Sequence, residues 1–241
     1  MNLRAFIDAL RADLAAPGRT WTARGGVEMI VIPAGEVRLG PARRRATLSA
    51  FSIARHPVTF RSFQHFVAET GYTGAAGNRP LLGGSVPSDV LDHPAVDVSW
   101  RDAQAWCAWA GLILPTGPMW ERAARGTDGR TYPWGEHRPT NALARISAQG
   151  TLPVGSFPAV RTATGCEDMV GNISEWCHPG DNPGAPLDVE ARHCVVRGSA
   201  YLRYPNRQRM ACAHQRRLSP DRRNRWVGFR PATLRLGPGD G

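Results

Sequence analysis

The stretch that decides the fold covers residues 99–126 and reads SWRDAQAWCAWAGLILPTGPMWERAARG. Its apolar residues recur at helical spacing, in two segments that each have a start signal and a stop signal. Ser99 is a good N-cap with Asp102 in the first turn, and Gly111 ends this first helix. Thr116 precedes the second helix, which ends at Gly126. The stretch therefore predicts two short helices, each with tryptophan on its buried face.

Short strands and loops are expected on both sides of this stretch. Apolar runs predict strands at 27–32 and 46–53, with another short strand between them that ends at residue 39. Thr59 can cap a further helix that closes at Gly71. We expect an amphipathic N-terminal helix at 1–18, a loop at 74–93 and a flexible tail at 237–241. No linker divides residues 19–236, so the sequence predicts one α+β domain that is rich in loops.

Composition is that of a globular protein. Of the 241 residues 42% are hydrophobic, and 26 glycines with 20 prolines indicate many loops. No apolar run is long enough to span a bilayer, and charges interrupt the first sixteen residues, so we expect a cytoplasmic location and no membrane partner. The five cysteines are widely spaced without a CxxC pair, which predicts reduced, partly buried thiols.

Positive charge is concentrated near the C-terminus. The net charge is +10, and every basic residue apart from histidine is arginine. Ten arginines fall between residues 197 and 230, where Asp221 is the only acid. We expect about a third of these arginines to pair internally with backbone carbonyls, because arginine offers five donors to a fold short of regular structure. The others are the main candidates for a binding surface.

Many short segments, in order along the chain, resemble the signature pattern of the formylglycine-generating-enzyme/sulfatase-modifying-factor family. They are IPAGE (32–36), FSIARHPVT (51–59), HPAVDVSW (93–100), LPT (114–116), WERAARG (120–126), YPWG (132–135), PVG (153–155), DMVGN (168–172), EW (175–176), VRG (196–198) and VGFR (227–230). So many segments in one order identify the chain as a member over roughly residues 27–232. The resemblance implies a C-type-lectin-like fold, with few short helices and strands and loops that converge on one face. Trp100, Trp120, Trp134 and Trp176 would then be core anchors.

The resemblance also implies one calcium site in the loop 168–175. The side chains of Asp168 and Glu175 and the carbonyls of Gly171 and Ile173 would supply the mixed oxygen shell that a hard divalent cation needs. The alternative is that the two carboxylates cap turns or pair with arginines. A second calcium site, known in some members, is not expected because residues 141–150 contain no carboxylate.

Family members that make formylglycine bind copper through a close pair of cysteines after an Arg-Gly turn, since soft thiolates suit a cuprous ion. Here Arg197 and Gly198 are followed by YLRYPNRQR (201–209), and the next cysteine is Cys212. We therefore assign no catalytic residue, and expect no copper, no formylglycine synthesis and a buried thiol at Cys212. Iron stays open, although the seven histidines form no HxH, HxxxH or HExxH pair and the helical iron-binding domain of some relatives is not expected here.

The leading hypothesis is a non-catalytic ligand- or protein-binding module with an arginine-rich C-terminal loop face. The candidate residues are Tyr201, Arg203, Tyr204, Asn206, Arg207, Arg209, Arg222, Arg223, Arg225 and Trp226. An acidic protein is the expected partner and nucleic acid the second choice, since arginine binds carboxylate or phosphate with two parallel hydrogen bonds. The segment also matches the position of hypervariable residues in variable proteins of diversity-generating retroelements. The rival hypothesis is an accessory metal-dependent oxidoreductase of the non-haem iron type that acts on a peptide or small molecule.

Overall fold

The computed structural model describes residues 18–74, 86–137, 139–141, 143–146, 150–180, 193–200 and 207–239. The helix expected at 1–18 lies outside this part of the chain except for its last residue. The first sheet is wholly antiparallel and has the order β1–β2–β5–β10. Its strands are β1 (Thr20–Ala23), β2 (Val27–Ile32), β5 (Phe51–Ala54) and β10 (Ala232–Thr233). Strand β10 thus returns the C-terminal part of the chain to the N-terminal sheet.

The second sheet comes from the last third of the chain. It has the order β8–β7–β6–β9, in which β6 and β9 are parallel and the other pairs antiparallel. Its strands are β6 (Ser174–Cys177), β7 (Cys194–Arg197), β8 (Gln215–Leu218) and β9 (Val227–Phe229). A separate hairpin contains β3 (Gly35–Leu39) and β4 (Arg44–Leu48). The prediction of a single strand at 46–53 is wrong, because residues 49 and 50 belong to no strand. The part before them lies in β4 of the hairpin, and the part after them lies in β5 of the first sheet.

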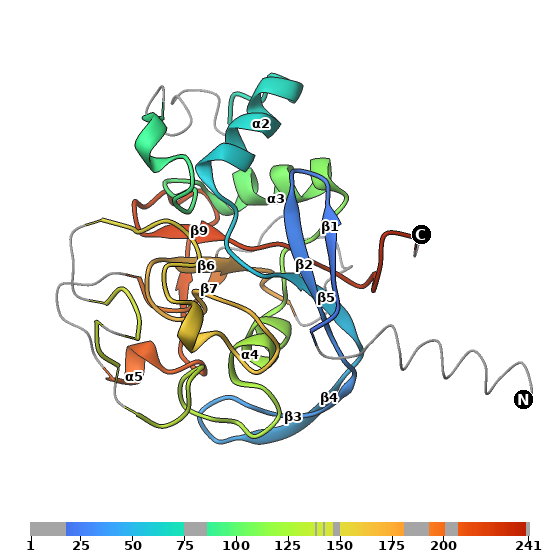
Figure 1. Ribbon diagram of the computed structural model, residues 1–241, viewed down its shortest axis with the longest axis vertical. Helices are drawn as coiled ribbons and strands as arrows, with labels where there is room; N and C mark the ends of the chain where they lie inside the picture. Colours follow the sequence, from blue (N-terminus) through green and yellow to red (C-terminus); the bar gives the residue numbers. More distant parts are fainter. Residues whose placement is uncertain are drawn as a thin grey trace, which may run out of the picture.

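The three helices expected from the sequence are confirmed, together with their caps. They are α2 (Phe60–Thr70), α3 (Trp100–Ala110) and α4 (Gly117–Arg125), which are capped by Thr59, Ser99 and Thr116. Ser99 and Asp102 form a capping box, in which each side chain accepts from the other residue's backbone N–H. Three shorter helices, η2 (Ser88–Val90), η3 (Pro158–Val160) and α5 (Arg207–Met210), were not expected. In Figure 1, α2 and α3 lie together at the top, the β3–β4 hairpin lies at the bottom, and β6, β7 and β9 lie between them.

Tryptophans anchor the core, as expected from the motifs. Trp100, Trp120 and Trp176 are buried, and their indole N–H groups donate to Cys177 O, Glu175 Oε2 and Val98 O at 3.0, 2.7 and 3.0 Å. A buried indole that keeps a hydrogen-bond partner contributes apolar contact without leaving its polar atom unsatisfied. Trp134 is a partial exception, since it is only half-buried and stacks on Tyr132 with 5.5 Å between ring centroids.

The glycine of the VGFR segment is required by close packing. Gly228 lies in β9, and a Cβ at this position would come within 2.3 Å of the carbonyl oxygen of Ala95. Any other residue would push β9 away from the segment before α3, where Val58 N also donates to Phe229 O. Among the described residues, no helix is both long and apolar enough to cross a membrane.

Candidate functional site

The candidate site begins at the turn 197–200, where β7 ends. Arg197 is buried, and its Nη1 donates to Cys212 O at 3.2 Å and lies 3.1 Å from Glu121 Oε2. Gly198 has φ 72°, and a Cβ there would lie 3.1 Å from the carbonyl oxygen of Met169. Buried contacts therefore hold the inner side of this turn, and the turn itself needs glycine.

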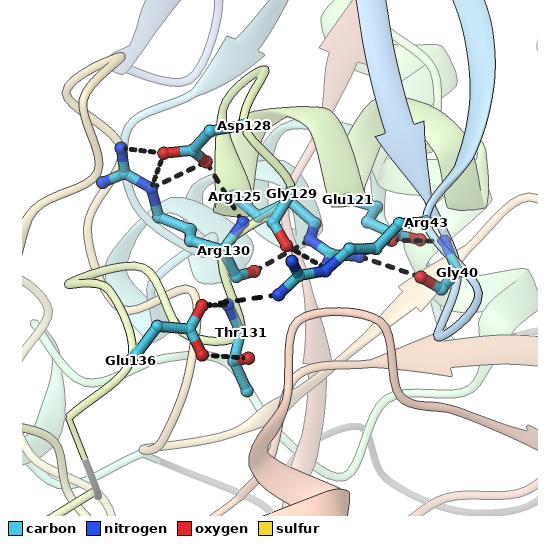
Figure 2. A network of polar contacts seen from close by, with 9 residues as sticks. All are labelled: Gly40, Arg43, Glu121, Arg125, Asp128, Gly129, Arg130, Thr131 and Glu136. Atoms are coloured by element: carbon cyan, nitrogen blue, oxygen red, sulfur yellow. Dashed lines mark hydrogen bonds and ion pairs between the residues drawn. The ribbon is translucent and has the colours of Figure 1, made fainter.

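Glu121 connects this turn to the rest of the molecule. Its Oε1 accepts from Gly40 N at 2.7 Å and from Arg125 Nη1 at 2.5 Å, while Oε2 faces Arg197. Figure 2 shows the part of this network around Arg125, which also donates to the carbonyl of Arg130 at 2.9 Å. One buried carboxylate thus serves two buried arginines, so the cluster carries an excess positive charge. We did not expect this cluster, although the spacing of Glu121 and Arg125 is a signal for it.

Arg122, on the same helix, adds to this positive charge. Its side chain is 5% exposed, and it makes no hydrogen bond or ion pair with any residue that the structure describes. Burial alone lowers the pKa of its guanidinium. The buried Nε has no hydrogen-bond partner, and no described acid balances the charge of Arg122, so this side chain adds to the positive charge around α4.

The described part of the C-terminal segment presents cationic side chains with one aromatic ring. We call this the arginine face, and define it as Arg209, Arg216, Arg217, Arg222, Arg225 and Trp226. Of the expected binding residues, Arg209, Arg222 and Arg225 are exposed, and Trp226 is half-buried. Arg207 begins α5, but its side chain is outside the described residues, as are Tyr201, Arg203, Tyr204 and Asn206.

Ring stacking and electrostatics connect the elements of the arginine face. The guanidinium of Arg216, in β8, lies 4.5 Å from the ring centroid of Trp226. The pKa of Arg216 is lowered by burial and then by the charge of Arg209 in α5. The pKa of His214 is also lowered, first by burial and then by three arginines that include Arg216 and Arg209. Burial is the larger cause of both shifts, and the neighbouring arginine charges add to it, which favours a neutral His214.

Arg223 is a correction to the expected binding face. Its side chain is 9% exposed, and its Nη2 lies 2.9 Å from Asp102 Oδ2, the carboxylate that also caps α3. Its charge is therefore used to hold the loop 219–226 against that helix. Among the described arginines of this segment, Arg197 and Arg230 also pair internally, each with an acid and with backbone carbonyls. Arg197 and Arg230 agree with the expectation that some of these arginines pair with backbone carbonyls, whereas Arg223 pairs with a carboxylate.

The carboxylate of Glu175, expected to bind calcium, is held by Arg230 in the centre of the domain. Arg230 Nε donates to Glu175 Oε2 at 2.7 Å and Nη2 donates to Oε1 at 2.8 Å, and both side chains are buried. Trp120 Nε1 donates to the same Oε2. Both carboxylate oxygens thus accept from the guanidinium of Arg230, which places a positive charge next to them. The carboxylate of Glu175 therefore pairs with an arginine, which is the alternative that the sequence left open.

Two of the other expected calcium ligands, Asp168 and the Gly171 carbonyl, also have protein partners. Asp168 Oδ2 accepts from Gly155 N, and the Gly171 carbonyl accepts from Ile173 N, both at 2.7 Å. Burial raises the pKa of Asp168, which disfavours its charged form. The part of the chain that the structure describes contains no group of three or more His, Cys, Asp or Glu side chains placed to hold a metal ion. The calcium site therefore stays a prediction from the resemblance.

A cleft lies between the β1–β2 turn, the segment 56–59 and α2, and the sequence did not predict it. Its volume is about 580 Å³. His56 lines it, and the Nε2 of His56 lies 3.3 Å from Oε2 of the largely buried Glu167. Arg55 Nη1 lies 3.7 Å from the other oxygen of Glu167. His56 Nε2 makes no hydrogen bond with the described residues, and a buried polar atom without a hydrogen-bond partner beside a cleft of this size marks a candidate small-molecule site.

All five cysteines are free and buried, which confirms the prediction of reduced thiols. Burial raises the pKa of Cys194 and of Cys212 to about 12. Both side chains are therefore thiols at neutral pH, whereas metal binding and nucleophilic attack need thiolates. Cys212 is the buried thiol that the sequence predicted.

The fold and these sites define a single-domain, loop-rich α+β protein with a cationic C-terminal surface. A profile of the sulfatase-modifying factor enzyme 1-like domain matches residues 19–234. The chain belongs to this family.

Two relatives and two solved structures show the range of similar proteins. The formylglycine-generating enzyme of Mycobacterium tuberculosis is 30% identical in an alignment that is 240 positions long. This alignment covers 70% of this chain and 79% of that protein. Hercynine oxygenase of the same organism is 35% identical in an alignment that is 159 positions long. This alignment covers 53% of this chain and 37% of that enzyme. PvdO from Pseudomonas aeruginosa has a TM-score of 0.76 at 23% identity and covers 91% of this chain and 99% of its own. Treponema denticola variable protein 1 has a TM-score of 0.65 at 21% identity, with coverages of 90% and 99%. At these identities the two structures show the shared fold.

Proposed function

We propose that this chain is a non-catalytic binding module whose arginine face takes up an acidic protein. The observation that carries the proposal is a set of four guanidinium groups, those of Arg209, Arg216, Arg217 and Arg222. None of them makes a hydrogen bond or ion pair with any residue in the described ranges, and Asp221, the only acid nearby in sequence, pairs with Arg101 at 2.8 Å. Arginines that lack acids of their own, beside a half-buried tryptophan, suit a partner that supplies carboxylates.

Two further observations support a binding role. The buried thiols argue against thiolate chemistry, so we propose neither copper binding nor formylglycine synthesis. The fold is that of Treponema denticola variable protein 1, and residues 199–226 hold the whole arginine face. As a second part of the proposal, we expect variants of this protein to differ at residues 199–226. Sequences of the gene from sibling strains, together with a reverse transcriptase gene next to it, would establish this.

Replacing Arg209, Arg217 and Arg222 together with serine is expected to weaken binding of a glutamate-rich peptide at least tenfold. The reason is that each arginine loses a charge-assisted contact, and tenfold corresponds to only about 1.4 kcal/mol for all three. The melting temperature should change by no more than about 2 °C, because exposed substitutions away from buried contacts cost little. Fluorescence anisotropy and differential scanning calorimetry measure the two effects.

The matched control replaces Arg38, Arg44 and Arg45 of the β3–β4 hairpin with serine. These side chains are also exposed, so the net charge changes equally while the arginine face stays intact. The control should retain peptide binding. An equal loss in both triple variants would mean that only overall charge matters, and would contradict a defined binding face.

The second candidate function is a metal-dependent oxidoreductase, and the cleft beside His56 is the observation that favours it. The relative hercynine oxygenase is an enzyme, and His56 with Glu167 would supply two ligand types that iron accepts. Metal analysis of the purified protein decides between the two functions. We expect less than about 0.1 iron or copper per chain for a binding module, because the described residues provide no complete ligand set. Near-stoichiometric iron or copper would overturn the binding proposal, whereas calcium alone would agree with it and with the expected loop site.

A further inference from the structure

Strand β8 forms an open edge of the second sheet, next to the arginine face. It pairs with β7 on one side only, with Leu218 opposite Cys194 at one end and Gln215 opposite Arg197 at the other. Within the described residues, the backbone groups on its other side make no hydrogen bond. Such a row of unpaired N–H and C=O groups is a template for one more strand.

The side chains of β8 fix this strand in place. Arg216 stacks on Trp226, and Leu218 packs against the core that contains Trp100 and Trp176. The side chain of Gln215 accepts from Arg197 Nη2 at 3.4 Å. An edge that is held on its inner side loses little conformational freedom when a new strand pairs with it.

Charge around β8 selects what can be added to it. Arg217 is exposed on the strand itself, and Arg209 and Arg222 are exposed on the segments before and after it. A second copy of β8 would bring arginines opposite arginines, which is unfavourable between adjacent strands. An incoming strand with carboxylates would instead form ion pairs across the new edge. The β3–β4 hairpin also exposes arginines, but the acids Glu36 and Glu136 lie there, and Glu136 pairs with Arg43 at 3.7 Å.

We infer that β8 binds an extended acidic peptide segment as a fifth strand of the second sheet. This inference rests on the proposed function and adds the geometry of recognition to it. Backbone hydrogen bonds to β8 set the direction of the peptide, and alternate acidic side chains reach the exposed arginines. Nucleic acid has the charge but lacks the backbone amides that this edge would pair with.

The test uses the full chain and an eight-residue peptide that alternates glutamate and threonine. Two further peptides carry N-methyl groups either on every glutamate or on every threonine, so that each blocks the N–H groups along one edge. We expect the unmodified peptide to bind, one methylated peptide to bind at least tenfold more weakly, and the other to bind nearly as well. Amide hydrogen exchange should show new protection in residues 215–218 when the unmodified peptide is bound.

The outcomes separate the inference from the proposed function. If both methylated peptides bind as tightly as the parent, strand addition is wrong while acidic binding stands. If both lose affinity equally, or residues 215–218 gain no protection, strand addition is also wrong. If no acidic peptide binds in low salt, the proposed function itself fails. Tighter binding of an eight-nucleotide oligothymidine than of the peptide would overturn the class of partner.

Charge reversal at the strand provides the protein-side test. Arg217→Glu should weaken the unmodified peptide at least tenfold, and Arg45→Glu in β4 is the control for an exposed arginine on another edge. Both side chains are exposed, so both variants should fold. Equal binding by Arg217→Glu and the unaltered protein would overturn the placement of the peptide on β8.

Discussion

Replacing Arg230 with methionine is expected to lower the free energy of unfolding by about 3–5 kcal/mol, the cost of leaving one member of a buried ion pair alone. Arg230 is fully buried and holds both oxygens of Glu175. It also donates to the carbonyls of Ala54, Arg55 and Glu167 at 3.0, 2.7 and 2.8 Å. Methionine leaves Glu175 charged and those carbonyls without their donor, so strand β5, strand β6 and the loop before Asp168 lose their common partner.

Urea denaturation followed by tryptophan fluorescence measures this effect. Arg217→Met is the matched control, and because Arg217 is exposed it should change stability by less than about 0.5 kcal/mol. Combining Arg230→Met with Glu175→Leu should recover part of the loss, since the unpaired carboxylate is then removed as well. A loss below about 1 kcal/mol in the single variant would mean that solvent or another cation compensates Glu175, contrary to its burial.

Replacing Glu121 with glutamine is expected to cost a similar amount, about 3–5 kcal/mol. The amide keeps the shape of the side chain but removes the charge that balances Arg125 and Arg197, whose side chains are 3% and 7% exposed. The amide also turns one acceptor into a donor that faces a guanidinium (Figure 2). Because Arg197 carries the turn that leads to the arginine face, we expect peptide binding to weaken together with stability.

Thermal unfolding by circular dichroism tests this variant against Glu136→Gln. Glu136 also faces an arginine, but its side chain is 64% exposed, so the control should cost less than about 1 kcal/mol. Adding Arg122→Met to Glu121→Gln should restore some stability, since the cluster around α4 then carries one cation fewer. Equal costs for Glu121→Gln and Glu136→Gln would show that the cluster around α4 is solvated.

Local chemistry made the helices and their limits predictable. Thr59, Ser99 and Thr116 are followed by apolar residues at helical spacing, and a cap satisfies backbone groups within three residues. The order of the motifs likewise predicted one loop-rich α+β domain. The break at Ser49 was not predictable, because residues 46–53 read as one strand-like run, and β4 pairs with the neighbouring β3 whereas β5 pairs with β2 and with the distant β10.

The candidate site was less predictable, because burial of an arginine depends on distant residues. In the sequence nothing distinguishes Arg223 from Arg222, yet the guanidinium of Arg223 lies 2.9 Å from Asp102, more than a hundred positions earlier. Glu175 likewise resembles a calcium ligand until Arg230 is placed beside it. The spacing of Glu121 and Arg125 did indicate a pair, but not the third member, Arg197.

The pairing of β10 with β5 has a consequence for how the chain is made. Ala232 lies opposite Ile53, so one edge of β5 has no partner strand until residue 232 has been synthesised. At usual rates of synthesis the interval between these two strands is roughly 10–40 s. During that time the unpaired N–H and C=O groups along this edge of β5 are open to chaperones and to other nascent chains. Premature termination before residue 232 would therefore release a product in which β5 is an unpaired edge strand, and such fragments should be prone to aggregate.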